Sequence, residues 1–263
     1  MTRFPLLRSV RTFPGWMITL PACFAALLCW ELAGARGLIS SLFFPVPSAI
    51  FEKLIQMAYS GRLAGQLEVT VIRLLVGMFF GGGIGLILGL MMGWSDRLRS
   101  ALDPLVALLH PIPKIAVFPL IMVIFGIGEV SKVFLISLAA FFPMVINAMA
   151  GVRQIHPVYF KVARNYGARP AQVFRRVVLP GSIPSVLAGV RIATNTALVL
   201  TIAVELLASD RGLGAMIWMA WETLRIKELY VGILVAALLG IGFNVLFWIS
   251  MNRMVPWNRT HDA

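Results

Sequence analysis

The chain has 263 residues, of which 59% are hydrophobic and only 13% charged, and its formal net charge is +12. A soluble domain could not bury this much apolar surface, so the composition excludes a water-soluble globular protein and indicates an integral membrane protein. Membrane topology and attraction to anionic membrane lipid account for the positive charge, and nothing in the chain resembles a nucleic-acid-binding module.

Long apolar stretches recur along the chain. Because roughly 20 helical residues cross a bilayer, we predict one all-α membrane domain at residues 15–254, between a cytoplasmic segment at 1–14 and a cytoplasmic tail at 255–263. Six transmembrane helices are expected, at about residues 15–34, 66–94, 99–127, 131–151, 182–208 and 229–252. The first apolar run is longer than a signal-peptide core, although Ala33-Gly34-Ala35 leaves cleavage open as an alternative.

The distribution of basic residues predicts the orientation. Lys and Arg are more numerous in the segments that are cytoplasmic if both termini lie inside than in the outer segments, so we expect both termini in the cytoplasm. Pro45 and Pro47 break the apolar stretch at 37–51. That stretch is expected to be an external loop leading into a short surface helix near Ser48.

Five glycines, at positions 77, 81, 85, 89 and 93, recur at every fourth residue of the second span. This spacing forms a ridge along which another helix backbone can approach closely. A static helix contact and a moving interface both fit the pattern.

Polar groups within membrane spans are costly and usually face a protein interior or a wet cavity. The candidates for lining a translocation path are Lys114, Asn147, Thr194, Asn195 and Glu205. The third span is also interrupted by Pro111 and Pro113, which free backbone carbonyls and predict a broken helix at membrane depth. Packing kinks and snorkelling side chains are the alternative explanations.

A basic, polar segment at 152–181 separates two apolar runs. Pro157 is expected to open a short helix and Gly167 to close it, while Pro170 opens a second helix that Pro180 breaks. The first of these helices is too short to be stable alone in water, so it requires a packing partner. The alternative is an ordinary connector whose charges only enforce topology.

Several kinds of site are absent from the sequence. No Gly is followed by Lys, so the phosphate-binding loop of P-loop ATPases is missing. Any ATP hydrolysis therefore requires a partner subunit. The three histidines lack metal-ligand spacing, and Cys23 and Cys29 both lie in the first span. We therefore expect neither an enzyme nor a metal site.

The segment 152–181 resembles the EAA motif of ABC importer permeases, with Lys161-Val162-Ala163, Gly167, Val177, Leu179 and Pro180 at the motif spacing. Lys161 stands where the family prefers Glu, and Val162 where it has Ala. Further stretches similar to the nitrate/sulfonate/taurine branch lie at 44–48, 111–114, 125–129, 150–153, 187–191 and 205–214. The residues that the resemblance implies for ATPase coupling are His156, Pro157, Val158, Tyr159, Phe160, Lys161, Val162, Ala163, Arg164, Gly167, Ala168, Leu179 and Pro180.

The resemblance implies a type I ABC importer (MetI-like) permease fold in the bacterial inner membrane. It also implies four kinds of partner: a pair of ATPase subunits that bind ATP and Mg, a periplasmic or lipoprotein solute-binding protein, a second permease copy and membrane lipid. The solute is expected to be nitrate, a sulfonate or taurine, or else a pyrimidine precursor. An ion-coupled secondary transporter is the alternative, although only Glu205 approaches a membrane acid.

Overall fold

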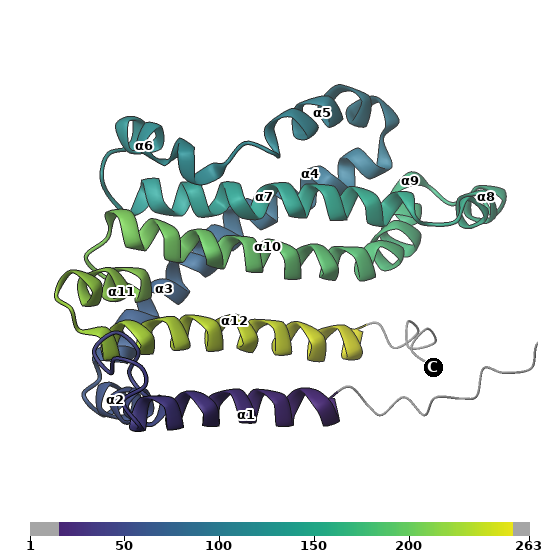
Figure 1. Cartoon of the computed structure of the whole chain (residues 1–263). Coiled ribbons are helices and arrows are strands. Elements are labelled where there is room, and N and C mark those ends of the chain that lie inside the picture. Colours follow the sequence, from purple (N-terminus) through teal and green to yellow (C-terminus); the bar gives the residue numbers. More distant parts are fainter. Residues whose placement is uncertain (1–15, 255–263) are drawn as a thin grey trace, which may run out of the picture.

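The computed structural model describes residues 16–254, and every regular element in this part of the chain is helical (Figure 1). The α-helices are α1 (Trp16–Ala35), α2 (Pro47–Tyr59), α3 (Arg62–Gly77), α4 (Gly83–Trp94), α5 (Asp96–Leu109), α6 (Lys114–Phe125), α7 (Glu129–Arg153), α8 (Pro157–Asn165), α9 (Pro170–Val173), α10 (Leu179–Ala208), α11 (Leu213–Glu222) and α12 (Ile226–Met254). Two π-helical turns, η1 (Met78–Gly82) and η2 (Phe174–Val178), lie between α3 and α4 and between α9 and α10. The predicted terminal segments at 1–14 and 255–263 lie outside the described residues.

Four helices in the described chain are long and apolar enough to cross a membrane, namely Arg62–Trp94, Glu129–Arg153, Pro170–Ala208 and Ile226–Arg253. The helix expected over 99–127 is instead two helices, α5 and α6, which meet at an angle of 98° and form a fifth span only if counted together. Pro111 and Pro113 lie in the break, where proline removes backbone donors and disfavours helix at the preceding residue. The apolar stretch of α1 at Thr19–Ala35 is shorter than the other spans.

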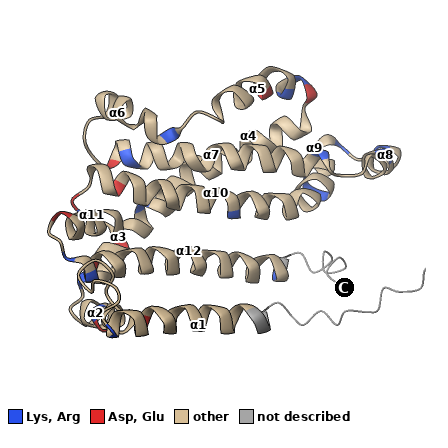
Figure 2. Cartoon of the chain, viewed as in Figure 1, with Lys and Arg blue, Asp and Glu red and all other residues tan. Residues whose placement is uncertain are grey.

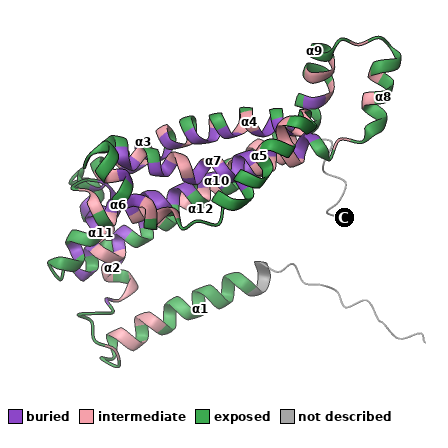
Figure 3. Ribbon diagram, turned by 90° about the horizontal axis from the view of Figure 1, so that it is seen from above, coloured by how far each residue is buried: buried purple, intermediate pink, exposed green. Residues whose placement is uncertain are grey.

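Helices α7 and α10 lie side by side at the centre of the bundle and carry much of its buried surface (Figure 3). The glycine ridge of the second span packs on α7. A Cβ atom on Gly85 would lie 2.6 Å from the carbonyl oxygen of Phe141, and one on Gly89 would lie 2.5 Å from that of Val145. The ridge is therefore a close helix contact in which a side chain has no room.

Pro180 does not break a helix as predicted. Residues Pro170–Ala208 form one continuous helix through α9, η2 and α10, and Pro180 lies in the first turn of α10. In a regular α-helix the proline ring would clash with the carbonyl four residues earlier, that of Arg176. That residue belongs to the wider turn η2, and this local change of helix type accommodates the proline.

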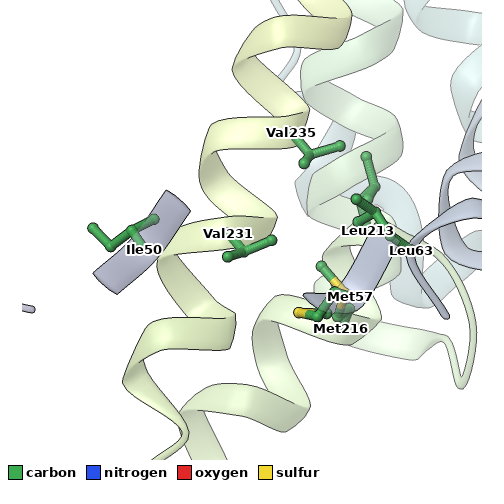
Figure 4. Packing of buried hydrophobic residues seen from close by; sticks show 7 residues of the cluster. All are labelled: Ile50, Met57, Leu63, Leu213, Met216, Val231 and Val235. Atoms are coloured by element: carbon green, nitrogen blue, oxygen red, sulfur yellow. The ribbon is translucent and has the colours of Figure 1, made fainter. Parts of the chain in front are cut away.

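One end of the bundle is closed by α2, α3, α11 and α12. Their shared apolar cluster is shown in Figure 4 and consists of Ile50, Met57, Leu63, Leu213, Met216, Val231 and Val235. Helix α2 begins at Pro47, one residue before the expected Ser48. The backbone N–H and hydroxyl of Ser48 donate to the carboxylate of Glu31, at 3.0 and 2.7 Å, which ties α2 to the end of α1.

The two ends of the molecule differ. Helix α8 lies at one end, together with the first residues of α1 and the last residues of α12, whereas α2 and α11 lie at the other (Figure 1). Charged residues gather toward both ends, with few between them (Figure 2). This is the distribution expected of a bundle that crosses a membrane.

Candidate functional site

Helix α8 is delimited by local signals, as predicted. Pro157 occupies its first turn, and His156 caps it by accepting a hydrogen bond at Nδ1 from the backbone N–H of Val158, at 3.3 Å. At the other end Gly167 has φ +70°, and the N–H of Ala168 donates to the carbonyl of Ala163 at 3.0 Å. This is a Schellman-type end, in which the left-handed residue is favourably glycine.

Helix α8 presents apolar side chains to its surroundings. It has no buried residue and extends beyond the bundle (Figure 3). Val158, Tyr159 and Val162 are exposed to 49%, 62% and 48%, and the charged Lys161 and Arg164 are exposed beside them. An apolar patch rimmed by charge on a projecting helix is typical of an interaction surface.

Phe160 does not share this surface. It is half-buried, and its ring lies 6.3 Å from that of Trp94, which also contacts the ring of Phe174 at 5.9 Å. Since residues four apart share a helix face, Val158 and Val162 point together and Phe160 points nearly the opposite way. Phe160 therefore attaches α8 to the bundle on the side opposite to Val158 and Val162, and its predicted contact with a partner stays a prediction.

The base of α8 borders a groove of about 460 Å³. His156 and Tyr159 line it from one side, and Pro180 lines it from the first turn of α10. Leu179 is exposed to 38% beside it. The structure thus brings the two ends of the predicted coupling segment together, although they are more than 20 residues apart in the sequence.

Two of the five predicted path residues lie in one cavity. Lys114, in the first turn of α6, and Asn195 of α10 line a cavity of about 550 Å³ between the α5–α6 break, α7 and α10. The other residues lining it are His110, Ile115, Ala139, Pro143, Ile192, Thr196, Val199 and Leu200. The ammonium of Lys114 donates to the carbonyl of His110 and lies 4.9 Å from the centre of the Phe142 ring.

The other three predicted path residues are placed differently. Asn147 donates to the carbonyl of Pro143 at 2.8 Å, and buried Thr194 donates to that of Val190 at 2.9 Å. Both therefore satisfy a carbonyl of their own helix, four residues back. Glu205 is fully buried and belongs to a separate network of polar groups. The structure does not place these three in the cavity with Lys114.

The network around Glu205 joins α3, α10 and the start of α11. Arg73 Nη1 lies 2.9 Å from Glu205 Oε1, and the hydroxyl of Thr70 lies 2.9 and 3.0 Å from the two carboxylate oxygens. The backbone N–H of Gly214 donates to the same carboxylate at 3.0 Å. The N-terminal end of a helix, here α11, is a favourable place for a buried carboxylate.

Arg73 continues the network to α7. Its guanidinium makes two further bonds of 2.7 Å to the carboxylate of Glu129 and one of 2.7 Å to the carbonyl of Arg211. The Arg73 side chain is 5% exposed and that of Glu129 61%. Sequence reasoning left Arg73 out of the candidates. The signal that could have found it is the buried acid itself, because Glu205 requires a basic partner at the same depth.

The glycines at 212 and 214 make room for this carboxylate. A Cβ on Gly212, whose φ is +115°, would overlap the carboxyl group of Glu205, and one on Gly214 would lie 2.6 Å from the Cβ of Glu205. The stretch at 205–214, which resembles the nitrate/sulfonate/taurine branch, therefore forms one packed unit in which the two glycines surround the Glu205 side chain.

These features together define a helical membrane protein with a mainly apolar cavity that includes a lysine and an asparagine, and with a helix available for docking at one end, which is the organisation of a transport subunit. The chain belongs to the family described as binding-protein-dependent transport system inner membrane component, whose match covers residues 81–260. The prediction that this chain is the permease subunit of an ABC importer is thereby confirmed.

Individual relatives agree with this assignment. The chain is 35% identical to the taurine transport system permease protein TauC of Escherichia coli, over 97% of this chain and 93% of the relative. It is 32% identical to the putative aliphatic sulfonates transport permease protein SsuC of Bacillus subtilis, over 95% and 90%. It is 28% identical to the nitrate import permease protein NrtB of Leptolyngbya laminosa, over 89% and 86%.

A solved structure confirms the predicted fold. The inward-facing MetNI methionine ABC transporter superposes with a TM-score of 0.64, covering 71% of this chain and 93% of the matched chain at 19% identity. At this identity the likeness concerns the fold alone.

Proposed function

We propose that two copies of this chain enclose the translocation path of an ATP-driven importer for a small solute, and that α8 of each copy docks on a separate ATPase subunit. The observation that carries the first part is the position of the cavity that contains Lys114 and Asn195. Lys114 and Asn195 lie in it half-buried, and Thr196 beside them is exposed.

This cavity opens on a face that the isolated chain leaves uncovered. Val199 is 71% exposed and Ile192 49% exposed on the same side of α10. Polar side chains at membrane depth do not face lipid, because hydrocarbon cannot satisfy them. A second copy of the chain placed over this face would enclose the polar groups in a path between the two permeases.

The docking role rests on α8. Its exposed Val158, Tyr159 and Val162 form an apolar centre with Lys161 and Arg164 around it, and apolar anchors inside a charged rim are typical of specific interfaces. Because this chain lacks a phosphate-binding loop, ATP and Mg would be bound by the partner. We infer that Lys161 pairs with an acidic group there.

The helix Pro170–Ala208 can transmit motion from the docking end to the path. It runs without a break from beside α8 to Asn195 and Thr196 in the cavity wall, a distance of roughly 40 Å at 1.5 Å per residue. When α8 moves with its docked ATPase, this helix moves with it. The pore would change between inward-facing and outward-facing states in this way.

The opposite end of the bundle suits the solute-binding protein. Helix α2 and the start of α12 line a groove of about 460 Å³ whose charged residues include Lys53 and Glu228, 3.2 Å apart. A polar, charged groove remote from α8 fits a partner that docks from the other side of the membrane. In this arrangement the start of α1 and the end of α12 lie on the cytoplasmic side of the membrane, at the end where α8 is found, as expected if both termini are cytoplasmic.

The solute we propose is a small molecule or ion with an oxyanion group, namely taurine, another sulfonate or nitrate, since relatives named for these solutes are similar over most of the chain. A pyrimidine precursor is the second candidate. Coupling to an ion gradient finds little support, because Glu205 is fully buried and paired with Arg73.

The test is made on permease reconstituted with its ATPase and binding protein. Val162→Asp should lose ATPase co-purification and ATP-dependent uptake of radiolabelled taurine or nitrate, because it places a charge in the apolar centre of the α8 surface. Asn165→Asp, at the exposed last residue of α8, adds the same charge and should retain both. Normal co-purification of the Val162→Asp permease would contradict the proposed docking.

A further inference from the structure

The Lys114 ammonium has no counter-ion within the described chain. The ion pairs at residues 16–254 all involve other cations, and the cavity around Lys114 is lined by no Asp or Glu. Six of the lining residues are aliphatic or proline and supply no group that could neutralise the ammonium. An unpaired charge in such surroundings is costly unless a partner of opposite charge is supplied.

We propose that this cavity is an anion-binding subsite of the translocation path, in which Lys114 and Asn195 hold the oxyanion group of the solute. The inference rests on the proposed function and narrows its solute to a small anion. The missing negative charge arrives with the solute and leaves with it.

Hydrogen-bond donors in the cavity remain available. The ammonium of Lys114 has three N–H donors, of which the His110 carbonyl takes one. The side-chain oxygen of Asn195 accepts a hydrogen bond from Asn244 at 3.0 Å, and its NH2 group, which has two N–H donors, makes one long bond of 3.5 Å back to Asn244. Several N–H groups can therefore point at an oxyanion, the group for which charge-assisted hydrogen bonds are strongest.

The surroundings add positive potential. The N-terminal end of α6 begins at Lys114 and has no side-chain cap, so its backbone N–H groups contribute partial positive charge. Arg191 donates to the Asn244 side chain at 2.8 Å, and Asn244 in turn donates to Asn195 at 3.0 Å. A second cation thus lies one amide away from the cavity wall.

The aliphatic walls set the size and remaining character of the solute. Ile115, Val199 and Leu200 offer no acceptor for a second polar group. A sulfonate with a short carbon chain, or nitrate, would fit this chemistry, whereas a cation would be repelled by Lys114. A neutral heterocycle would leave the ammonium without its partner.

Replacement and restoration of the charge test the subsite. In a permease carrying Cys23→Ser and Cys29→Ser, which removes both cysteines of the chain, Lys114→Cys should lower kcat/KM for ethanesulfonate and nitrate uptake roughly ten- to hundred-fold, the size of one charge-assisted hydrogen bond. Treatment with 2-aminoethyl methanethiosulfonate restores an ammonium at nearly lysine length and should recover uptake. The neutral methyl methanethiosulfonate blocks the same thiol and should not.

The controls use the same complex. The cysteine-free background should be insensitive to both reagents, and so should Arg36→Cys, which removes an exposed basic residue after α1. Equal recovery with the neutral reagent, or unimpaired uptake by the Lys114→Cys permease, would overturn the subsite.

A second measurement does not depend on transport. With Thr196→Cys as a reporter in the cavity wall, millimolar ethanesulfonate should slow modification by N-ethylmaleimide, whereas neutral methanesulfonamide should not. Lys114→Met should abolish this protection. Absence of protection while Lys114 is present overturns the anion site. If no solute is taken up by any complex, the proposed function fails, and the protection result still decides the subsite.

Discussion

Replacement of Arg73 by methionine should strongly destabilise the permease. Arg73 is 5% exposed and is the cation paired with the fully buried Glu205, 2.9 Å away. Removing one partner of a buried pair typically costs about 3–5 kcal/mol, because it leaves the other charge uncompensated. Thr70 and Gly214 would still donate to the carboxylate, so we expect a loss of about 3 kcal/mol, at the lower end of this range.

Two further variants test whether the loss of stability comes from the buried Arg73–Glu205 pair. The Glu129 side chain is 61% exposed, so Glu129→Gln removes a solvent-screened pair and should cost about 1 kcal/mol or less. Replacing both Arg73 and Glu205 by methionine removes the buried pair together and should cost less than Arg73→Met alone, since paired replacement by apolar groups is often neutral.

The assay is the unfolding of purified full-length permease by titration with sodium dodecyl sulfate in mixed micelles, followed by tryptophan fluorescence. The reasoning requires Arg73→Met to be the least stable of the three variants. It is refuted if Arg73→Met unfolds together with Glu129→Gln, or if the double variant is less stable than the single one.

Glycine substitutions separate close contact from conformation. Gly89→Ala should destabilise the permease by about 1–3 kcal/mol through overpacking against Val145, whereas Gly83→Ala, with open space beside it, should be tolerated in the same titration. At Gly167, where φ is +70° and nothing lies within 4 Å, Asn should preserve more ATPase co-purification than Ala, because Asn tolerates the left-handed conformation. Equal loss with both residues would show that the requirement at Gly167 is steric contact with the partner.

Local signals predicted the elements that depend on local chemistry. Pro157 and Gly167 mark the ends of α8 because helix caps are determined within a few residues. The glycine spacing predicted the face that packs on α7 for the same reason, since it follows from helix geometry alone. Pro180 was misinterpreted because the π-helical turn before it, which accommodates the proline ring, has no signal in the sequence.

The polar site was only partly predictable. Sequence reasoning selected Lys114 and Asn195 together with Asn147 and Thr194, because all four are polar residues in apolar spans. It could not tell that two of them bond a carbonyl of their own helix, since that depends on the rotamer. Arg73 escaped notice because its partner Glu205 lies 132 residues away in the sequence.

Helix α1 is attached to its neighbours close to its C-terminal end, where Glu31 bonds Ser48 and the Trp30 ring lies 5.9 Å from that of Tyr230. From residue 20 to residue 29 its side chains are exposed, so in a bilayer they would meet lipid tails. The requirement on this stretch is then mainly hydrophobicity, so one apolar residue can replace another during evolution. The same freedom makes it a convenient position for a fluorescent label that leaves the pore undisturbed.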